Sequence, residues 1–219
     1  MGTLLASEII ARANETAQDE TAVIWESSQA LAWLNDGQRA LASVRPDASI
    51  LNHSVILQPG TKQSITGLRL MAVVRNMGVD GATPGDAIRL VERGAKDESD
   101  ISWHTETASA VVKEWIFDAR TPREYYVSPP VVATPVVQVE VSEAVVPAAV
   151  SDVADPITLE DIYSPHLIEW ILYRFFSRDS EETPNIQRAI SHFSAFFNLL
   201  GEKMQVDMAI NPKVRAHLE

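Results

Sequence analysis

Two histidines and a glutamate in the C-terminal third have a spacing that could hold a metal ion. His166 and Glu169 lie three positions apart in a segment with helical periodicity, so both side chains would project from one face. His192 lies in the next expected helix, which we predict to pack beside the first. Such ligands would support a metal-dependent hydrolase, a function that we keep open. A stable site needs three or four converging ligands, and no further histidine or carboxylate falls in these apolar stripes. We therefore expect surface or capping roles and predict no bound metal or cofactor.

Other catalytic patterns are missing from the sequence. It has no cysteine, which excludes thiolate nucleophiles, disulfides and cysteine-ligated metals. No Gly-x-Ser-x-Gly motif occurs, and the glycine-rich run at residues 78–85 lacks the Gly-Lys-Ser/Thr of a phosphate-binding loop. We interpret that run as a turn and nominate no catalytic residue. The sequence therefore predicts that the protein is not an enzyme.

The charge balance is strongly acidic. The chain has 219 residues, with 30 Asp and Glu against 18 Lys and Arg, which gives a formal net charge of -12. This charge opposes a surface that grips the phosphates of DNA or RNA. Between Arg123 and Arg174 there are acidic residues but no Lys or Arg, and this stretch is either an ordinary solvated face or a surface that repels nucleic acid or docks a basic partner. Its acidic residues are Glu124, Glu140, Glu143, Asp152, Asp155, Glu160, Asp161 and Glu169.

No segment is typical of membrane insertion. The longest uncharged stretch, residues 125–139, is too short to span a bilayer and is interrupted by prolines. The first eight residues have no basic group and reach Glu8 before an apolar run of signal-peptide length. We therefore expect no contact with a membrane.

Helical spacing of apolar residues appears near both ends of the chain. We predict helices over residues 3–18, from Ser27 or Ser28 to Pro46, and over residues 67–77. Two more begin at a hydroxyl residue followed by proline, at residues 164 and 183. We expect these two to pack as an antiparallel pair through their apolar stripes. The stripe of the second helix consists of Ile186, Ile190, Phe193, Phe197 and Leu200.

The middle of the chain is rich in β-branched and aromatic residues, which favour strands. We predict strands at residues 87–91, 114–118, 124–127 and 136–141, with a hairpin at 54–66 around Pro59-Gly60 and a second hairpin turn at 118–123. The fold class is therefore α+β: N- and C-terminal helices form a helical bundle, residues 1–84 and 157–219, around an inserted antiparallel β-sandwich, residues 85–156. Exposed aromatics such as Trp103, Tyr125 or Tyr126 would suit a carbohydrate-binding module, a second alternative function. The five tryptophans are otherwise expected in the core.

Several short phrases, in this order, resemble the tail adaptor proteins of short-tailed bacteriophages. They cover almost the whole chain, and one departs from the family pattern because Ser128 stands where a tyrosine usually precedes two prolines. The phrases are Trp33-Leu34-Asn35-Asp36-Gly37-Gln38-Arg39, Arg45-Pro46-Asp47-Ala48, Leu57-Gln58-Pro59-Gly60-Thr61-Lys62-Gln63, Glu114-Trp115-Ile116-Phe117-Asp118, Tyr125-Tyr126-Val127-Ser128-Pro129-Pro130 and Asp161-Ile162-Tyr163.

The resemblance implies a structural protein of the virion, assembled in the host cytoplasm. Its expected partners are further copies of itself in a twelvefold ring, the portal protein, the tail nozzle protein and, as further candidates, tail fibres. Genomic DNA would pass through the ring without sequence-specific binding. The helical part would face the portal and the β part the tail. The residues that we predict to contact partners are Tyr125, Tyr126, Glu140, Glu143, Lys213 and Arg215.

Overall fold

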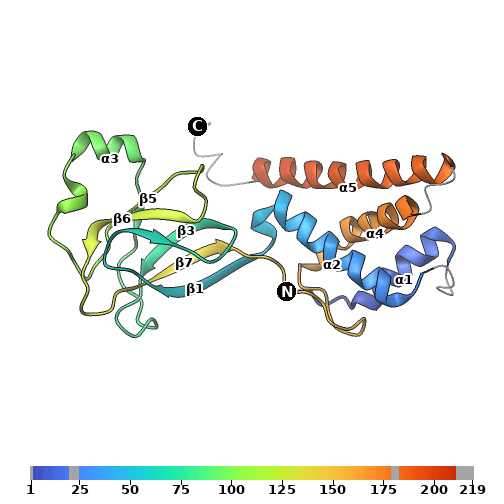
Figure 1. Ribbon diagram of the computed structural model, residues 1–219, viewed down its shortest axis with the longest axis horizontal. Coiled ribbons are helices and arrows are strands. Elements are labelled where there is room, and N and C mark those ends of the chain that lie inside the picture. Colours follow the sequence, from blue (N-terminus) through green and yellow to red (C-terminus); the bar gives the residue numbers. More distant parts are fainter. Residues whose placement is uncertain (1, 20–24, 179–182, 211–219) are drawn as a thin grey trace. The chain divides into compact units, whose positions relative to one another are not determined.

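The computed structural model describes residues 2–19, 25–178 and 183–210 and divides into two compact units. Unit 1 comprises Met1–Leu41 and Pro147–Glu219, and unit 2 comprises Ala42–Val146. Figure 1 shows that the long helices belong to unit 1 and the sheets to unit 2. The predicted α+β class, a helical bundle with an inserted β-sandwich, is confirmed. The inserted unit begins at Ala42 instead of residue 85 and ends at Val146 instead of residue 156, because three strands already precede residue 85.

Unit 1 is built from the helices that the N- and C-terminal patterns predict. They are α1 (Ala6–Ala17), α2 (Ser27–Val44), the 3₁₀ turn η3 (Asp161–Tyr163), α4 (Ser164–Arg178) and α5 (Thr183–Ile210). α4 packs against both α1 and α5, and the colours in Figure 1 show that α4 and α5 run antiparallel, as predicted. The turn expected between them lies partly outside the described residues. α5 continues to Ile210, beyond Leu200, the last residue of its predicted apolar stripe.

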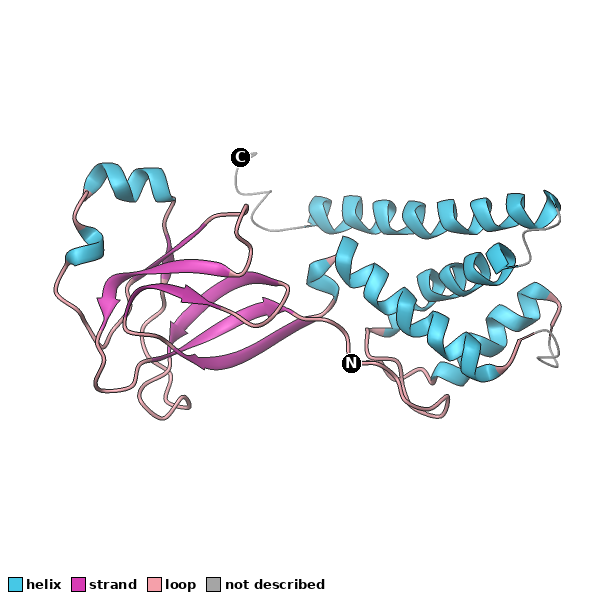
Figure 2. Cartoon of the chain, in the orientation of Figure 1, coloured by secondary structure: helices cyan, strands magenta, loops and turns pink. Residues whose placement is uncertain are grey.

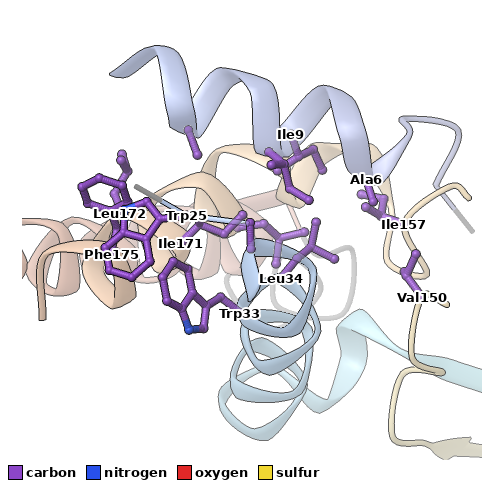
Figure 3. Close-up of a cluster of buried hydrophobic side chains, with 14 of the residues drawn as sticks. Ala6, Ile9, Trp25, Trp33, Leu34, Val150, Ile157, Ile171, Leu172 and Phe175 are labelled. Atoms are coloured by element: carbon purple, nitrogen blue, oxygen red, sulfur yellow. The ribbon is translucent and has the colours of Figure 1, made fainter. Parts of the chain in front are cut away.

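The core of unit 1 lies where α1, α2 and α4 meet. Ile9, Leu34 and Ile171 are each at most 2% exposed (Figure 3). The ring of Trp25 meets the rings of Trp33 and Phe175 edge-on, at centroid distances of 5.0 and 4.8 Å. Burying one such side chain contributes about 1.5–3 kcal/mol, so this cluster holds segments from both ends of the chain together.

The expected orientation of the α5 stripe is wrong. Among the described side chains of α5, Ala189, Phe196 and Leu200 are buried, at 5%, 0% and 1% exposed. The predicted stripe largely faces outward, since Ile190 is 59% exposed and Phe197 is 40% exposed. α5 therefore has two adjoining apolar faces, and its own unit covers only one of them.

Unit 2 is a sandwich of two sheets, as Figure 2 shows in magenta. The first sheet has the order β1-β7-β3, formed by β1 (Ile50–Ile56), β7 (Gln138–Ala144) and β3 (Arg69–Asn76). The second has the order β2-β6-β5-β4, formed by β2 (Gly60–Ser64), β6 (Glu124–Val131), β5 (Glu114–Phe117) and β4 (Arg89–Leu90). The 3₁₀ turn η1 (Pro46–Ala48) precedes β1, and the Val145 amide donates to the Ser49 carbonyl at 2.9 Å, so the two ends of the unit meet.

The sandwich core follows the strand alternation that the sequence predicts for 136–141. Val137, Val139 and Val141 are buried, and they pack with residues of the second sheet such as Trp115 and Val127. The hairpin predicted at 118–123 is confirmed by the antiparallel pairing of β5 with β6. The strand predicted at 87–91 is short and pairs with β5 in parallel, so the sandwich is not wholly antiparallel.

Two local predictions in this unit are wrong. Residues 67–77 form strand β3 instead of a helix, and β3 pairs with β7 through two register shifts. The predicted hairpin at 54–66 also fails, because β1 pairs with β7 and β2 pairs with β6. The Pro59-Gly60 turn exists, with Gly60 at φ +100°, but it carries the chain from one sheet to the other.

One excursion was not predicted from the sequence. Between β4 and β5 the chain forms helix α3 (Arg93–Ser99) and the 3₁₀ turn η2 (Trp103–Thr105), and η2 packs on β6. Trp103 is 0% exposed and anchors this excursion to the sandwich.

Candidate assembly surfaces

The outward side of α5 carries a stripe of exposed apolar side chains. The spacing of four, three, four and seven positions places its members on one side of the helix. Their exposed fractions are 42% for Ile186, 59% for Ile190, 39% for Phe193, 40% for Phe197 and 43% for Met204. An apolar side chain that faces solvent adds little to the stability of a single chain. Contiguous exposed apolar patches therefore mark sites of interaction with a partner.

Next to this stripe lies an apolar hollow of about 250 Å³ between α4 and α5. The rings of Tyr173 and Phe193 are 5.0 Å apart, and those of Phe193 and Phe197 are 4.9 Å apart, so aromatic contacts run from α4 into the stripe. The lining residues are Tyr173, Ser177, Ile186, Ala189, Ile190 and Phe193, none of them charged. The stripe and its hollow, which we call the α5 surface, therefore suit an apolar partner.

The candidate metal ligands have structural partners instead. His192 Nδ1 lies 2.7 Å from Glu169 Oε2, and the imidazole stacks on the ring of Phe176. His166 is buried at 5% exposed beside the rings of Tyr163 and Phe196, so the expected surface position of this histidine is wrong. Among the described residues, no group of three or more His, Asp or Glu is arranged to hold a metal ion.

The two predicted contact tyrosines lie on opposite faces of β6. Tyr125 is 1% exposed, and burial, together with the charge of Glu143, raises the pKa of its hydroxyl. Tyr126 is half-buried, and the Arg93 guanidinium lies 5.1 Å from its ring centroid. The rings of Trp103 and His104 also pack on Tyr126, which therefore keeps only part of its surface exposed, whereas Tyr125 belongs to the sandwich core.

The two predicted contact glutamates differ in the same way. Glu143 is 2% exposed, and its carboxylate accepts the Gly67 amide at 2.9 Å and lies 3.0 Å from His53 Nε2. Glu140 is partly exposed on the other face of β7 and pairs with Arg75 at 2.6 Å. Lys213 and Arg215 lie outside the described residues.

The acidic stretch is divided between the two units. Glu124 pairs with Lys62 at 2.9 Å in unit 2, while Glu169 pairs with His192 in unit 1. The Asp161 carboxylate accepts the amides of Thr3 and Leu4, at 2.7 and 3.0 Å, and these bonds lower its pKa. These three carboxylates therefore have partners within their own unit.

The aromatic residues give little support to a carbohydrate site. Trp103 is fully buried, and its indole nitrogen donates to Asp97 Oδ1 at 2.8 Å. Trp25, Trp33 and Trp115 are also buried, which confirms their expected core positions, and Trp170 is half-buried. Of the three residues expected at such a site, Trp103 and Tyr125 are buried and Tyr126 is half-buried.

The phrases that carry the family resemblance serve the fold. In the first phrase, Asn35 and Gln38 bind the backbone of the 147–159 loop. Gly37 admits the Trp170 ring, because a Cβ at this position would lie 2.9 Å from Trp170 Cδ1. In the third phrase, Gln63 accepts the Gln58 amide at 2.8 Å and donates to the Gln58 carbonyl at 2.7 Å, which closes the turn. The residues of these two phrases therefore have structural roles within the fold.

The described part of the chain combines a helical bundle, an inserted β-sandwich and an apolar α5 surface suited to a protein partner, which are features of a structural protein that binds other proteins. The chain belongs to the SU10 adaptor protein family, whose model matches residues 5–216. It is thus a structural adaptor protein of the bacteriophage tail, in agreement with the resemblance seen in its sequence. No curated protein matches the chain significantly. Within the described residues, no helix has the length and apolarity needed to cross a membrane.

Proposed function

We propose that the protein forms a closed ring, of about twelve copies, that joins the portal to the tail nozzle of the virion. The single observation that carries the ring is the α5 surface. Its outward side chains are apolar and exposed, although α5 already buries a second apolar face in its own unit. Burying this area against a neighbouring copy contributes about 25 cal/mol per Å².

The assignment of partners follows the resemblance to tail adaptors. Unit 1, with the basic residues Lys213 and Arg215 after its last described helix, would contact the portal. Unit 2 would contact the nozzle, and of its predicted contact residues Tyr126 and Glu140 keep part of their surface exposed. The net charge of -12 supports a passage for DNA, because like charge keeps the phosphates from adhering to the wall.

The ring is tested by placing charge on the α5 surface. Phe193→Asp combined with Phe197→Asp changes two exposed side chains, so the helical circular dichroism should stay at the wild-type level. In the presence of portal, this variant should remain monomeric by light scattering, while the wild type completes rings that are visible by electron microscopy. The control is Val206→Asp, a 58% exposed position on the same helix but away from the stripe.

Two outcomes would contradict the proposal. A folded double variant that forms rings as well as the wild type would show that the α5 surface is not the contact. Wild-type protein that stays monomeric on the portal would exclude the ring itself.

A further inference from the structure

The turn between α3 and η2 displays one aliphatic side chain almost completely to solvent. Ile101 is 93% exposed, and no other large hydrophobic side chain among the described residues exceeds 63%. Single exposed hydrophobics are common, so exposure alone decides nothing. Two further observations bear on Ile101: the polar contacts that fix its turn, and an apolar hollow elsewhere on unit 2.

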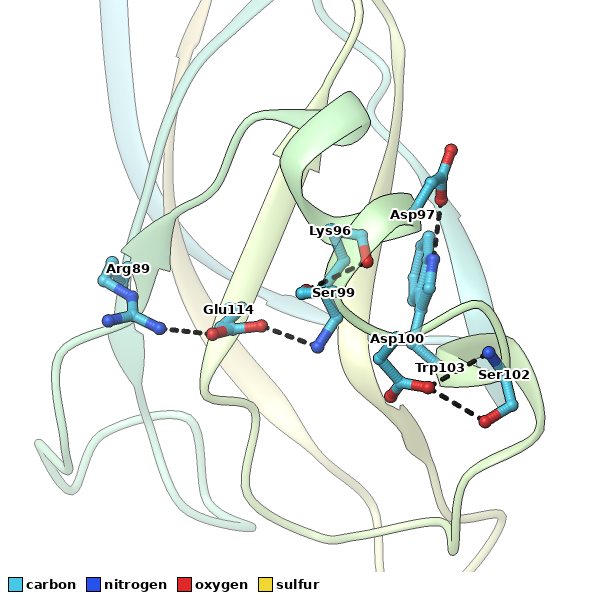
Figure 4. Close-up of polar contacts among 8 residues, drawn as sticks. All are labelled: Arg89, Lys96, Asp97, Ser99, Asp100, Ser102, Trp103 and Glu114. Carbon is cyan, nitrogen blue, oxygen red and sulfur yellow. Dashed lines mark hydrogen bonds and ion pairs between the residues drawn. The ribbon is translucent and has the colours of Figure 1, made fainter.

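The turn that holds Ile101 is fixed by a set of polar contacts, drawn in Figure 4. The Asp100 carboxylate accepts the Ser102 amide at 3.0 Å and the Ser102 hydroxyl at 2.8 Å, which closes the chain around Ile101. The next residue, Trp103, is buried, and its indole nitrogen donates a hydrogen bond to Asp97 of α3. Lys96 Nζ lies 3.0 Å from Glu114 Oε2, so α3 is also tied to β5. The exposed side chain therefore stands on a preorganised base, which lowers the entropy cost of using it in a contact.

A complementary feature exists elsewhere on unit 2. A hollow of about 280 Å³ is rimmed by three valines from separate segments: Val79 after β3, Val111 before β5 and Val136 before β7. These valines are 63%, 43% and 48% exposed. Three exposed aliphatic side chains around one concavity form a patch, which is the arrangement that marks a binding site.

This hollow is also held in shape by a buried polar residue. Asn76 is 7% exposed, and its amide nitrogen donates to the carbonyls of Asp86 and Val112 at 3.0 and 2.8 Å. Its amide oxygen accepts the Val112 amide at 2.9 Å. Gln138 donates to the Val79 carbonyl at 2.9 Å. The three segments of the rim are therefore joined before any partner arrives.

The two features lie at opposite sides of unit 2. Figure 1 shows α3 and the turn after it at the upper end of the unit, whereas the teal-green loop that follows β3 lies at the lower end. A cyclic ring is built from heterologous contacts, in which two different patches on opposite sides of each subunit meet. We propose that Ile101 of one copy inserts into the valine-rimmed hollow of the next copy. This inference rests on the proposed ring, and the occupant of the hollow is a second copy of this chain.

The absence of native cysteine allows a direct test of this contact. Rings of an Ile101→Cys, Val136→Cys double variant are assembled on the portal and treated with a short bismaleimide crosslinker. Each subunit should then join to both neighbours, so denaturing gels should show a ladder up to the full ring. Either single variant should give no ladder. A double variant of Val136→Cys with Ile162→Cys, whose isoleucine is 57% exposed in unit 1, is the matched control and should give none.

A charged substitution of Ile101 tests the contact independently, through the protein concentration needed for ring formation. Ile101→Asp should raise the protein concentration needed for ring formation at least tenfold, whereas Ile162→Asp should leave it within twofold. Neither substitution should alter folding, because both side chains are mainly solvated.

The outcomes separate this contact from the ring. Rings of the double variant without a ladder, together with normal assembly of Ile101→Asp, would overturn the contact and leave the ring standing. Failure of the wild type to form rings on the portal would overturn both proposals.

Discussion

Asn35 and Val150, which are 115 positions apart, exchange two hydrogen bonds. The Asn35 amide nitrogen donates to the Val150 carbonyl at 3.0 Å, and the Val150 amide donates to the Asn35 oxygen at 2.8 Å. Both bonds are buried, so the side chain imitates a strand partner for the loop that returns from unit 2. This pair fixes the loop onto α2 and explains why an asparagine is buried in this helix.

Removing this side chain should destabilise unit 1. Asn35→Ala leaves a buried carbonyl and a buried amide unpaired, and we expect it to lower the free energy of unfolding by about 2–4 kcal/mol. Urea titration followed by tryptophan fluorescence would measure the change. Asp36→Ala is the control, because its exposed ion pair with Arg39 contributes about 1 kcal/mol or less. Equal losses in the two variants would contradict this explanation.

Adjacent phenylalanines of α5 should respond differently to the same substitution. Phe196 is 0% exposed, so Phe196→Ala should cost about 3–5 kcal/mol of stability through the cavity that it leaves. Phe197 is 40% exposed, and Phe197→Ala should cost the isolated chain about 1 kcal/mol or less. Thermal unfolding at low protein concentration would compare them. The reverse order would show that the two faces of α5 are wrongly assigned.

Gly37 is expected to be required for the packing of α2 against α4. Alanine would gain about 1 kcal/mol of helix propensity, but its Cβ would lie 2.9 Å from Trp170 Cδ1, and the clash should make Gly37→Ala destabilising overall. Calorimetry would measure the melting temperature. Adding Trp170→Leu should recover part of the loss, because it removes the clashing ring. A double variant that is no better than the additive prediction would argue against this contact.

The Asp161 carboxylate should make stability depend on pH. Its bonds to the Leu4 amide, and to the Thr3 hydroxyl and amide, hold its pKa below the ordinary value in the folded state. The resulting stabilisation is present above the ordinary pKa and is lost as the pH falls through the folded pKa. The wild type should therefore be more stable than Asp161→Asn at pH 7, and the difference should shrink towards pH 3.

Chemical denaturation at a series of pH values would test this dependence. Glu160→Gln, at an exposed neighbouring position, removes one negative charge without these bonds and should show no such narrowing. A gap between wild type and Asp161→Asn that stays constant across the range would rule out a role for the Asp161 charge.

Most helices were predicted correctly from the sequence, but strand β3 was predicted as a helix. The reason lies in the way β3 pairs with β7. Register shifts follow Leu70 and Val73, so each bulge adds one residue and the buried positions become Leu70, Val73 and Asn76. A spacing of three imitates a helix, and only the pairing with β7, far along the chain, reveals a strand. The hairpin at 54–66 failed for a similar reason, because a turn signal does not specify which strands pair.

The candidate surfaces were predictable in part. The apolar stripe of α5 was recognised from spacing, yet spacing does not say which of two apolar faces a neighbouring helix will cover. Tyr125 and Tyr126 were both assigned to the surface, although adjacent residues of a strand point to opposite sides. Ile101 and its turn gave no sequence signal, since their arrangement depends on the burial of Trp103 against the sheet.

The hydrogen bond between Val145 and Ser49 places the first and last strands of unit 2 side by side where they leave the sheet. A segment that departs and returns at one point can be exchanged without rerouting the remaining chain. Unit 2 is therefore organised as a cassette. This one continuous segment can therefore be replaced within a single gene while the helices on both sides of it keep their own packing.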